Sequence, residues 1–207
     1  MADTLLIHVP KADKGPCAGI DEVGRGCLAG PVVAAAVMLP EHFSLPGLTD
    51  SKKLTAKKRE ALACQIKTGC LAWAIGLVGQ KTIDRINILQ ASILGMHRAL
   101  AQLKIVPEHI LVDGNKWKPY IPDGDLLEIP ARTVVKGDAT YMSIAAASVL
   151  AKTYRDDYML RLHGEYPMYH WDDNKGYPTP AHYEAIRQYG ITPYHRKTFN
   201  LRMNTCK

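Results

Sequence analysis

A run rich in valine and alanine, Pro31–Pro40, is bracketed by prolines and is typical of a buried strand. The segment Pro16–Asp21 precedes it, and a glycine-rich turn separates the two, so we expect a pair of strands joined by a loop. Residues 71–78 have the composition of a third strand, and residues 56–68 have that of a helix with Thr55 as its N-cap. The order strand, strand, helix, strand therefore restricts the first half of the chain to a sheet that is covered by a helix.

The second half of the chain alternates helices with short apolar runs. Between residues 82 and 103 the apolar positions fall mainly three or four apart, which indicates an amphipathic helix. Residues 109–113 and 131–136 are expected strands, and residues 140–162 are an expected long helix whose alanines let its axis approach the sheet closely. A short helix is expected at residues 180–189. This order predicts an α/β fold with a mixed sheet flanked by helices and with functional residues at strand ends and helix starts.

The bulk composition limits the class of protein. A chain of 207 residues is expected to form one domain with a small appended segment. Its net charge of +6 suits a polyanionic partner such as a nucleic acid. The five cysteines are odd in number and form no C-x-x-C pair, so we predict neither a disulfide framework nor a zinc knuckle and expect a reducing cytoplasm. No apolar stretch reaches the roughly 20 residues of a membrane span, and residues 1–14 lack the long uncharged core of a signal peptide.

Acidic residues stand beside apolar strands at three places. Asp21 and Glu22 end the first expected strand, Asp113 ends another, and Asp138 lies between a strand and the helix after it. A buried carboxylate costs on the order of several kcal/mol unless a cation or hydrogen bonds compensate it. Any one of these acids can be explained as a helix cap, a turn former or a surface charge. Their recurrence at separate strand ends favours an oxygen-rich site for Mg²⁺ or Mn²⁺, and without a His-x-x-x-His pattern a zinc hydrolase is not predicted.

The turn after the first expected strand is rich in glycine. Gly19-Ile-Asp-Glu-Val-Gly-Arg-Gly26 has the glycine spacing of a phosphate-binding P-loop, but Arg25-Gly26 replaces the Lys-Ser/Thr pair that binds phosphate and magnesium. We therefore do not predict binding of a nucleoside triphosphate. The backbone N–H groups of this turn have no obstructing Cβ, and together with Arg25 they suit close approach to a sugar or a phosphate.

Six blocks of sequence follow one another between about residues 16 and 200. They are Gly19-Ile-Asp-Glu-Val-Gly-Arg-Gly26, Asp50-Ser-Lys-Lys-Leu54, Val112-Asp-Gly-Asn115, Val135-Lys-Gly-Asp138, Ala145-Ala-Ala-Ser-Val-Leu-Ala-Lys152 with Arg155-Asp156, and Lys175-Gly-Tyr-Pro-Thr179. A single block such as Asp-Gly-Asn carries no weight, but six in this order resemble the bacterial ribonuclease HII family.

The resemblance implies a ribonuclease H-like fold, a mixed five-stranded sheet flanked by helices with a small helical C-terminal extension. Residues 1–207 would form a single catalytic domain, in which about residues 167–207 contact the substrate. Four carboxylates would hold two divalent cations, Mg²⁺ or Mn²⁺. By motif position these carboxylates are Asp21, Glu22, Asp113 and Asp138. Asp156 is the alternative to Asp138, but it is expected several turns along a helix and not near a strand end.

The activity that the resemblance implies is that of an endoribonuclease. It cuts the RNA strand of RNA–DNA hybrids and the 5′ side of ribonucleotides embedded in duplex DNA, by two-metal-ion hydrolysis that leaves 5′-phosphate and 3′-hydroxyl ends. Only the 2′-hydroxyl distinguishes RNA from DNA at a given sugar, so such an enzyme must contact it. By motif position the substrate-binding residues are Gly24, Arg25 and Gly26 at the ribose and its phosphate, Tyr177 against the deoxyribose on the 3′ side of the cut, and Lys52 and Lys175 at phosphates.

The remaining expectations concern partners and alternatives. Lys152, Arg196 and Lys197 add positive charge and are expected on a solvated face. We expect a cytoplasmic monomer that acts on RNA–DNA hybrid and ribonucleotide-containing duplex DNA and has no membrane partner. One alternative is a binding module of this fold without activity, against which the complete acidic set argues. Another is a different metal nuclease with the same sheet, such as type 1 ribonuclease H, which lacks the Asp-Glu-x-Gly-Arg-Gly block.

Overall fold

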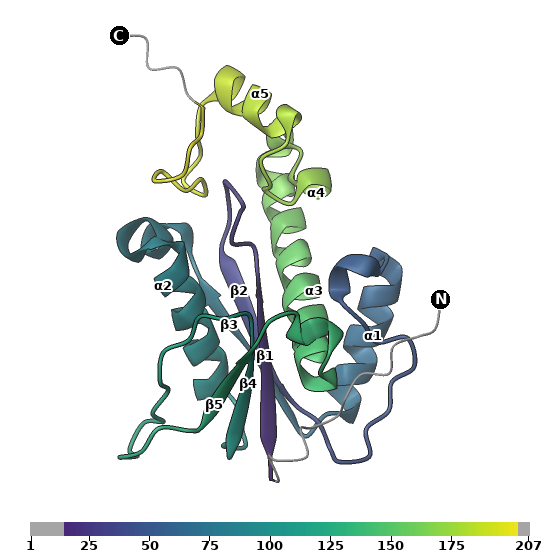
Figure 1. Ribbon diagram of the computed structural model, residues 1–207. Helices are drawn as coiled ribbons and strands as arrows, with labels where there is room; N and C mark the ends of the chain where they lie inside the picture. The colour runs from purple at the N-terminus through teal and green to yellow at the C-terminus, as the bar shows by residue number, and fades with distance from the viewer. Residues whose placement is uncertain (1–14, 203–207) are drawn as a thin grey trace.

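The computed structural model describes residues 15–202, whose helices and strands are shown in Figure 1. The prediction about residues 1–14 and the fifth cysteine, Cys206, lie outside these residues. The strands are β1 (Cys17–Val23), β2 (Val32–Met38), β3 (Ala72–Val78), β4 (His109–Asp113) and β5 (Ala131–Val134). The helices are α1 (Ala56–Gly69), α2 (Gln80–Ala101), α3 (Met142–Glu165), α4 (Trp171–Asn174) and α5 (Pro180–Tyr189), with short 3-10 helices η1 (Ser51–Lys53), η2 (Gly137–Ala139) and η3 (Pro167–Tyr169).

The strands form one mixed sheet in the order β3-β2-β1-β4-β5. β2 pairs antiparallel with β1 and with β3, whereas β4 pairs parallel with β1 and with β5. Ile20 of β1 stands beside Val112 of β4, so the carboxyl ends of these central strands lie side by side. The prediction of a mixed five-stranded sheet flanked by helices is confirmed.

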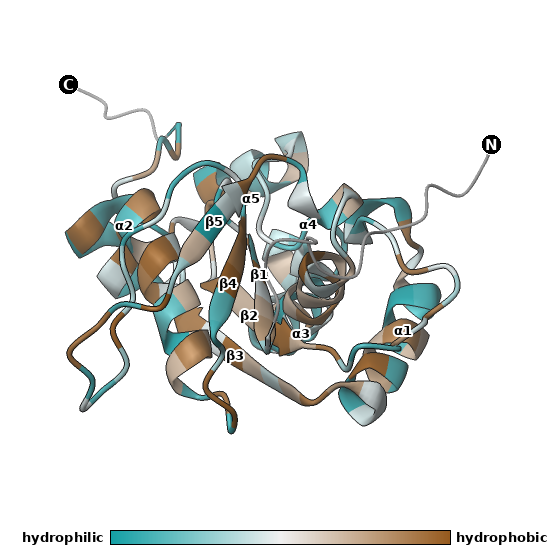
Figure 2. Ribbon diagram, turned by 60° about the horizontal axis from the view of Figure 1, so that its bottom comes forward, coloured by the Kyte–Doolittle hydropathy of each residue, from teal (hydrophilic) through white to brown (hydrophobic). Residues whose placement is uncertain are grey.

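Helices cover both faces of this sheet. α3 packs on β1 and β2 with α1 beside it, while α2 packs on the opposite face against β2 and β3 (Figure 1). Figure 2 shows hydrophobic residues along β3 and β4 between the helices. α4 and α5 lie beyond the end of the sheet, at the C-terminal end of α3, and form the predicted helical C-terminal extension.

α3 approaches β1 very closely. A Cβ at Gly19 would be 2.3 Å from the backbone carbon of Ser143, so this position admits only glycine. The alanines at 145–147, which were expected to allow this approach, are fully buried. The strand that carries Asp21 and Glu22 is therefore held directly against α3.

α2 differs from the expected continuous helix. It begins at Gln80 and contains a kink at Asn87, where φ is 64°. The side-chain oxygen of Asn87 accepts a hydrogen bond from the backbone N–H of Gln90 at 3.1 Å and so caps the segment after the kink. The periodicity of the apolar residues continues through the kink, and for that reason the sequence did not indicate it.

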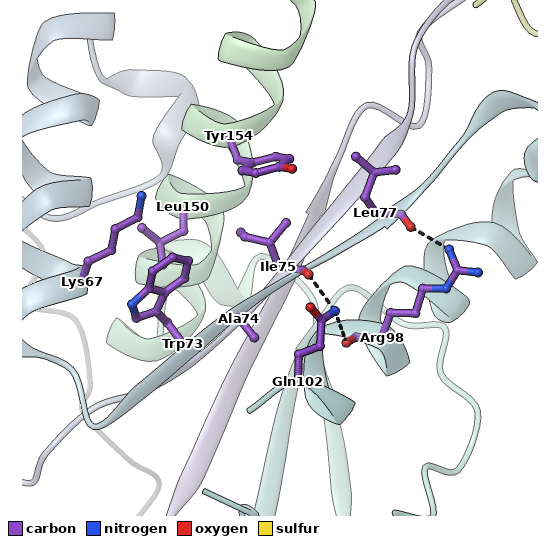
Figure 3. A pocket seen from close by; sticks show the side chains of 9 residues that line it. All are labelled: Lys67, Trp73, Ala74, Ile75, Leu77, Arg98, Gln102, Leu150 and Tyr154. Carbon is purple, nitrogen blue, oxygen red and sulfur yellow. Dashed lines mark hydrogen bonds between the residues drawn. The ribbon is translucent and has the colours of Figure 1, made fainter. Parts of the chain in front are cut away.

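The free edge of β3 is covered by side chains of α2 and of Gln102, the residue that follows its C-terminal end (Figure 3). Gln102 Nε2 donates to the carbonyl oxygen of Ile75 at 3.0 Å, and Arg98 Nη1 donates to that of Leu77 at 2.7 Å. Beside this edge lies a groove of about 650 Å³ where Trp73 is covered by Lys67, whose Nζ is 4.9 Å from the ring centre. Capping the outward carbonyls opposes pairing with another strand, and none of the predicted site residues lines the groove.

Two further expectations concern all described residues. Cys27, Cys64 and Cys70 carry free thiols. Among residues 15–202, no helix is both long and apolar enough to cross a membrane.

We expect Gly76→Ala to destabilise the fold, because a Cβ at this position in β3 would stand 1.9 Å from the carbonyl oxygen of Gly95 in α2. Overpacking of this kind costs about 1–3 kcal/mol. Gly164→Ala in α3 is the matched control, since nothing lies within 4 Å of its Cβ and alanine is the better helix former. Urea denaturation measures the free energy of unfolding of both variants, and an unchanged value for Gly76→Ala would contradict the packing of α2 on β3.

Candidate active site

Four acidic side chains lie at the carboxyl ends of β1 and β4 and in the turn after β5. Asp21 and Glu22 are near the end of β1, and the Oδ1 atom of Asp21 accepts a hydrogen bond from the backbone N–H of Glu22 at 2.7 Å. Asp113 is the last residue of β4, and its Oδ1 accepts from the backbone N–H of Gly137 at 2.7 Å. This bond joins β4 to η2, which contains Asp138. The sheet topology therefore gathers acids that are far apart in the sequence.

The acids raise one another's pKa. Burial raises the pKa of Asp21 well above its ordinary value, and the charges of Glu22 and Asp113 raise it further. Burial also raises the pKa of Glu22, although Arg25 opposes this from 3.1 Å. The pKa of Asp138 is raised by burial and then by Asp113. Burial is the largest cause of each shift, and the neighbouring carboxylates add to it.

Asp156, the alternative fourth acid, has a different environment. Its two carboxylate oxygens accept from Arg59 at 3.0 Å and from Lys152 at 2.7 Å. Its charge is therefore paired within the protein, whereas Asp138 faces another carboxylate. The geometry favours Asp138 as the fourth acid of the cluster.

The donor set of the cluster fits a hard divalent cation. All its donor atoms are carboxylate oxygens, which suit Mg²⁺ and Mn²⁺. No group of three or more His, Cys, Asp or Glu side chains within residues 15–202 is already placed to hold a metal ion, and Glu22 is paired with Arg25. A cation would therefore have to draw these carboxylates inward, and it would relieve the repulsion that raises their pKa values.

The glycine-rich turn after β1 is clamped by Arg196. This side chain is fully buried and donates to the carbonyl oxygens of Gly24 at 2.6 Å, Arg25 at 2.8 Å and Gly30 at 3.0 Å. The expectation of a solvated Arg196 was wrong, because its guanidinium binds the backbone of the turn and not the solvent. The burial of Arg196 could not be predicted from the sequence, because a single arginine in a basic segment looks like an ordinary surface residue.

Arg155 clamps the same loop from α3. It too is fully buried, and it donates to the carbonyl oxygens of Pro31 at 2.9 Å, Ala29 at 3.1 Å and Lys175 at 2.8 Å. A Cβ at Gly24, where φ is 93°, would be 2.1 Å from Arg155 Nε. The sequence block that contains Arg155 was noted, but its part in placing the turn was not.

Tyr177 stands next to this loop. The backbone N–H of Leu28 donates to the carbonyl oxygen of Gly176 at 2.7 Å, and the guanidinium of Arg155 lies 5.9 Å from the Tyr177 ring centre. The ring is 38% exposed, and the carbonyl oxygen of Tyr177 is 2.9 Å from His182 Nδ1. The tyrosine is thus both fixed and accessible.

A buried pair of histidines supports Tyr177 and was not found from the sequence. Trp171 Nε1 donates to His182 Nε2 at 3.1 Å, so the other ring nitrogen of His182 carries the proton that it donates to Tyr177. His195 Nε2 is 3.1 Å from the same His182 atom, and its Nδ1 accepts from the backbone N–H of Thr192 at 2.9 Å. Burial lowers the pKa of His195 to about 4, so the pair stays neutral.

The two predicted lysines have different surroundings. Lys52 is exposed in η1, and its charge lowers the pKa of Asp138, which places it beside the acids. Lys175 has a left-handed backbone with φ of 48°, and its Nζ donates to the carbonyl oxygen of Asp172. Next to Lys52, the hydroxyl oxygens of Ser51 and Ser148 are 2.9 Å apart and share a hydrogen bond. This bond holds η1 against α3.

A mixed five-stranded sheet with acids at the ends of adjacent strands defines a nuclease of the ribonuclease H-like class. A sequence model of the family "Ribonuclease HII" matches residues 18–205. The ribonuclease HII of Parabacteroides distasonis is 64% identical over 184 residues, which cover 89% of either chain. The chain therefore belongs to the ribonuclease HII family and is an endoribonuclease H.

Solved structures agree with this assignment. The ribonuclease H2 of Pyrococcus horikoshii OT3 is 30% identical, with a TM-score of 0.75 over 90% of this chain and 94% of the other. The ribonuclease HII of Archaeoglobus fulgidus, solved as a complex with PCNA, is 27% identical, with a TM-score of 0.72 over 92% of this chain and 98% of the other. The roles of the individual site residues stay predictions.

We expect Asp21→Asn to raise the melting temperature at pH 7 in the presence of a chelator. Because the pKa of Asp21 is raised in the folded protein, its protonated carboxyl group contributes fully to stability below the pKa of the unfolded chain, near 4. This contribution is lost as the pH rises through the pKa of the folded protein. Asp21→Asn removes this loss and keeps the Oδ1 acceptor. Its melting temperature should therefore exceed that of the unmodified protein by a few degrees at pH 7, and the difference should vanish toward pH 4. About 1 kcal/mol shifts the melting temperature of a domain of this size by roughly 2–4 °C.

Asp156→Asn is the control for this measurement, because it removes an ion-paired carboxylate and should lower the melting temperature. Differential scanning fluorimetry from pH 4 to pH 8 measures both variants. An Asp21→Asn protein that is less stable than the unmodified protein at pH 7 would show that the acids do not repel one another as described.

Proposed function

We propose that this endoribonuclease cuts the RNA strand of RNA–DNA hybrids and the 5′ side of ribonucleotides embedded in duplex DNA, leaving 5′-phosphate and 3′-hydroxyl ends. The strongest support is the position of the four acids beside a turn whose backbone is exposed at Gly26. Asp21 and Glu22 lead directly into that turn, so a phosphodiester at the acids has its sugar at Gly24–Gly26.

The proposal assigns Asp21, Glu22, Asp113 and Asp138 to two divalent cations, Mg²⁺ or Mn²⁺. Bound cations would supply the Lewis acidity that hydrolysis of a phosphodiester requires. The protein's own part would be to hold three carboxylates at the ends of β1 and β4 and the fourth in η2. Within residues 15–202, Glu22 is the one acid of the four that forms an ion pair, and its partner Arg25 has a side chain that is 47% exposed.

The turn Gly24–Gly26 would read the 2′-hydroxyl through its backbone. Arg196 holds the carbonyl oxygens of Gly24 and Arg25, so the N–H groups of the same peptide planes point the opposite way. Gly26 is exposed, and a Cβ placed on it would meet no atom within 4 Å. The backbone at Gly26 is therefore open to a ribose and its phosphate.

The remaining contacts would come from three further residues. Tyr177 would pack against the deoxyribose on the 3′ side of the cut, and Lys52 and Lys175 would contact phosphates. Tyr177 and Lys175 lie in the segment of residues 167–207, which we assign to substrate contact within a single domain of residues 1–207. Because one chain supplies all four acids, we infer that the enzyme works as a monomer; the cytoplasm remains its predicted location.

A cleavage assay tests this function. Labelled duplexes carrying no ribonucleotide, one or four are incubated with the protein and with Asp21→Asn, in Mg²⁺, Mn²⁺ or a chelator. We expect metal-dependent cleavage on the 5′ side of the single ribonucleotide, no cleavage of all-DNA duplex, and loss of at least about 100-fold in the variant because a cation ligand is removed. Cleavage of the four-ribonucleotide duplex alone would remove the role of Tyr177 at a junction, and binding without cleavage would favour the idle binding module.

Gly26→Ala tests the reading of the ribose by the turn. The free protein has room for this methyl group, so the variant should fold with an unchanged melting temperature. Cleavage should fall by about 10- to 100-fold, because the methyl group displaces the sugar from its hydrogen-bonding position. Gly79→Ala, at a second open glycine away from the acids, is the control; full activity of Gly26→Ala would show that the substrate does not approach this backbone.

A further inference from the structure

A small hollow adjoins the acids on the α2 side of the sheet. It has a volume of about 90 Å³ and lies between the turn after β1, the loop after β4 and the capped segment of α2. One water molecule requires about 10–15 Å³ of such space, so the hollow admits a small polar group such as part of a sugar or a phosphate. Its position makes it an extension of the active site.

The hollow contains a buried hydroxyl that has no partner. Ser92 of α2 lines it and is 2% exposed, yet among the described residues its Oγ forms no hydrogen bond. A buried polar group without a partner is unfavourable for folding. The wall of the hollow therefore contains a buried hydroxyl that has no hydrogen-bond partner among the described residues.

The rest of the lining matches a sugar with its phosphate. Leu89, Ile93 and Met96 of α2 provide an apolar wall suited to the C–H face of a sugar ring. Lys116 and Arg25 are exposed at its rim and can meet a phosphate. Leu89 is in the first turn after the kink, so the positive end of that helical segment also faces this side of the site.

If the substrate binds as in the proposed function, the position of the hollow identifies the nucleotide that it binds. Tyr177 lies on the far side of the turn, next to Arg155 and the Leu28–Gly176 hydrogen bond, whereas the hollow is bordered by Arg25 and α2. A strand whose 3′ deoxyribose lies on Tyr177 and whose ribose lies on the turn continues, in its 5′ direction, toward the hollow.

We propose that this hollow is a subsite for a second ribose-phosphate, on the 5′ side of the ribonucleotide read by the turn, and that Ser92 donates to or accepts from its 2′-hydroxyl. Lys116 binds the phosphate of the same nucleotide. The subsite makes the enzyme favour two consecutive ribonucleotides over one, because a deoxyribose leaves Ser92 without a partner. It also explains why a buried serine and not an alanine stands on this face of α2.

The test compares duplexes with one ribonucleotide and with two, which differ only in the 2′-hydroxyl at the 5′ neighbour. For the unmodified protein we expect kcat/KM to be about 3–10-fold higher with two ribonucleotides than with one. This factor corresponds to the net free energy of one hydrogen bond. Ser92→Ala should bring the ratio of the two values close to one, without lowering the melting temperature, because no internal hydrogen bond is lost. A 2′-O-methyl group at the 5′ neighbour should abolish the preference of the unmodified protein.

Thr153→Val is the matched control, since Thr153 carries another buried, unpartnered hydroxyl but lies on α3 outside the hollow. Thr153→Val should have the same ratio of kcat/KM for two ribonucleotides over one as the unmodified protein. A kcat/KM ratio near one for the unmodified protein would overturn the proposed subsite, and so would a ratio that Ser92→Ala leaves unchanged. A large fall in the melting temperature of Ser92→Ala would show instead that the hydroxyl of Ser92 has a structural role. Failure of the unmodified protein to cut either duplex would overturn the proposed function itself.

Discussion

Two buried guanidinium groups hold together the parts of this protein that meet around its active site. Arg155 reaches the loop between β1 and β2 from α3, and Arg196 reaches it from the C-terminal segment. Moving a guanidinium out of water is costly, and within residues 15–202 neither group forms an ion pair that would offset the cost. Hydrogen bonds to backbone carbonyls offset it instead. Loss of either arginine would free the turn, the Lys175–Tyr177 segment or both.

The same region keeps positive and negative charge apart. The carboxylates of Asp21, Glu22 and Asp138 have raised pKa values, while burial lowers the pKa of Arg196 to about 10. Among the described residues, Arg25 forms an ion pair with Glu22, and the charge of Lys52 lowers the pKa of Asp138. On the proposed function, divalent cations would neutralise the acids, and their binding would stabilise the folded protein.

Much of this arrangement was predictable from the sequence, because strands with short apolar runs and an amphipathic helix leave a clear pattern. The ordered blocks also indicated the ribonuclease HII family, and the acids at Asp21 and Asp113 stood out because charge beside an apolar strand is costly. Features that depend on contacts distant in sequence were not predictable. The burial of Arg196, the His182–His195 pair and the unpartnered Ser92 follow from packing, and each looks ordinary within its own segment. The kink at Asn87 was hidden because the apolar periodicity runs through it.

Rigidity of the turn bears directly on how a nuclease can reject DNA. A site that hydrogen-bonds a hydroxyl discriminates strongly against the analogue that lacks it only if the unpaired protein groups cannot find other partners. A glycine-rich turn is ordinarily free to rotate its peptide planes and would satisfy its N–H groups elsewhere. Here Arg196 fixes the carbonyl oxygens of Gly24 and Arg25, and with them the direction of the N–H groups in the same planes. On the proposed function, glycine would give the ribose access to the backbone, and the buried arginine would remove the conformational freedom that glycine otherwise brings. Selectivity for RNA would then require both.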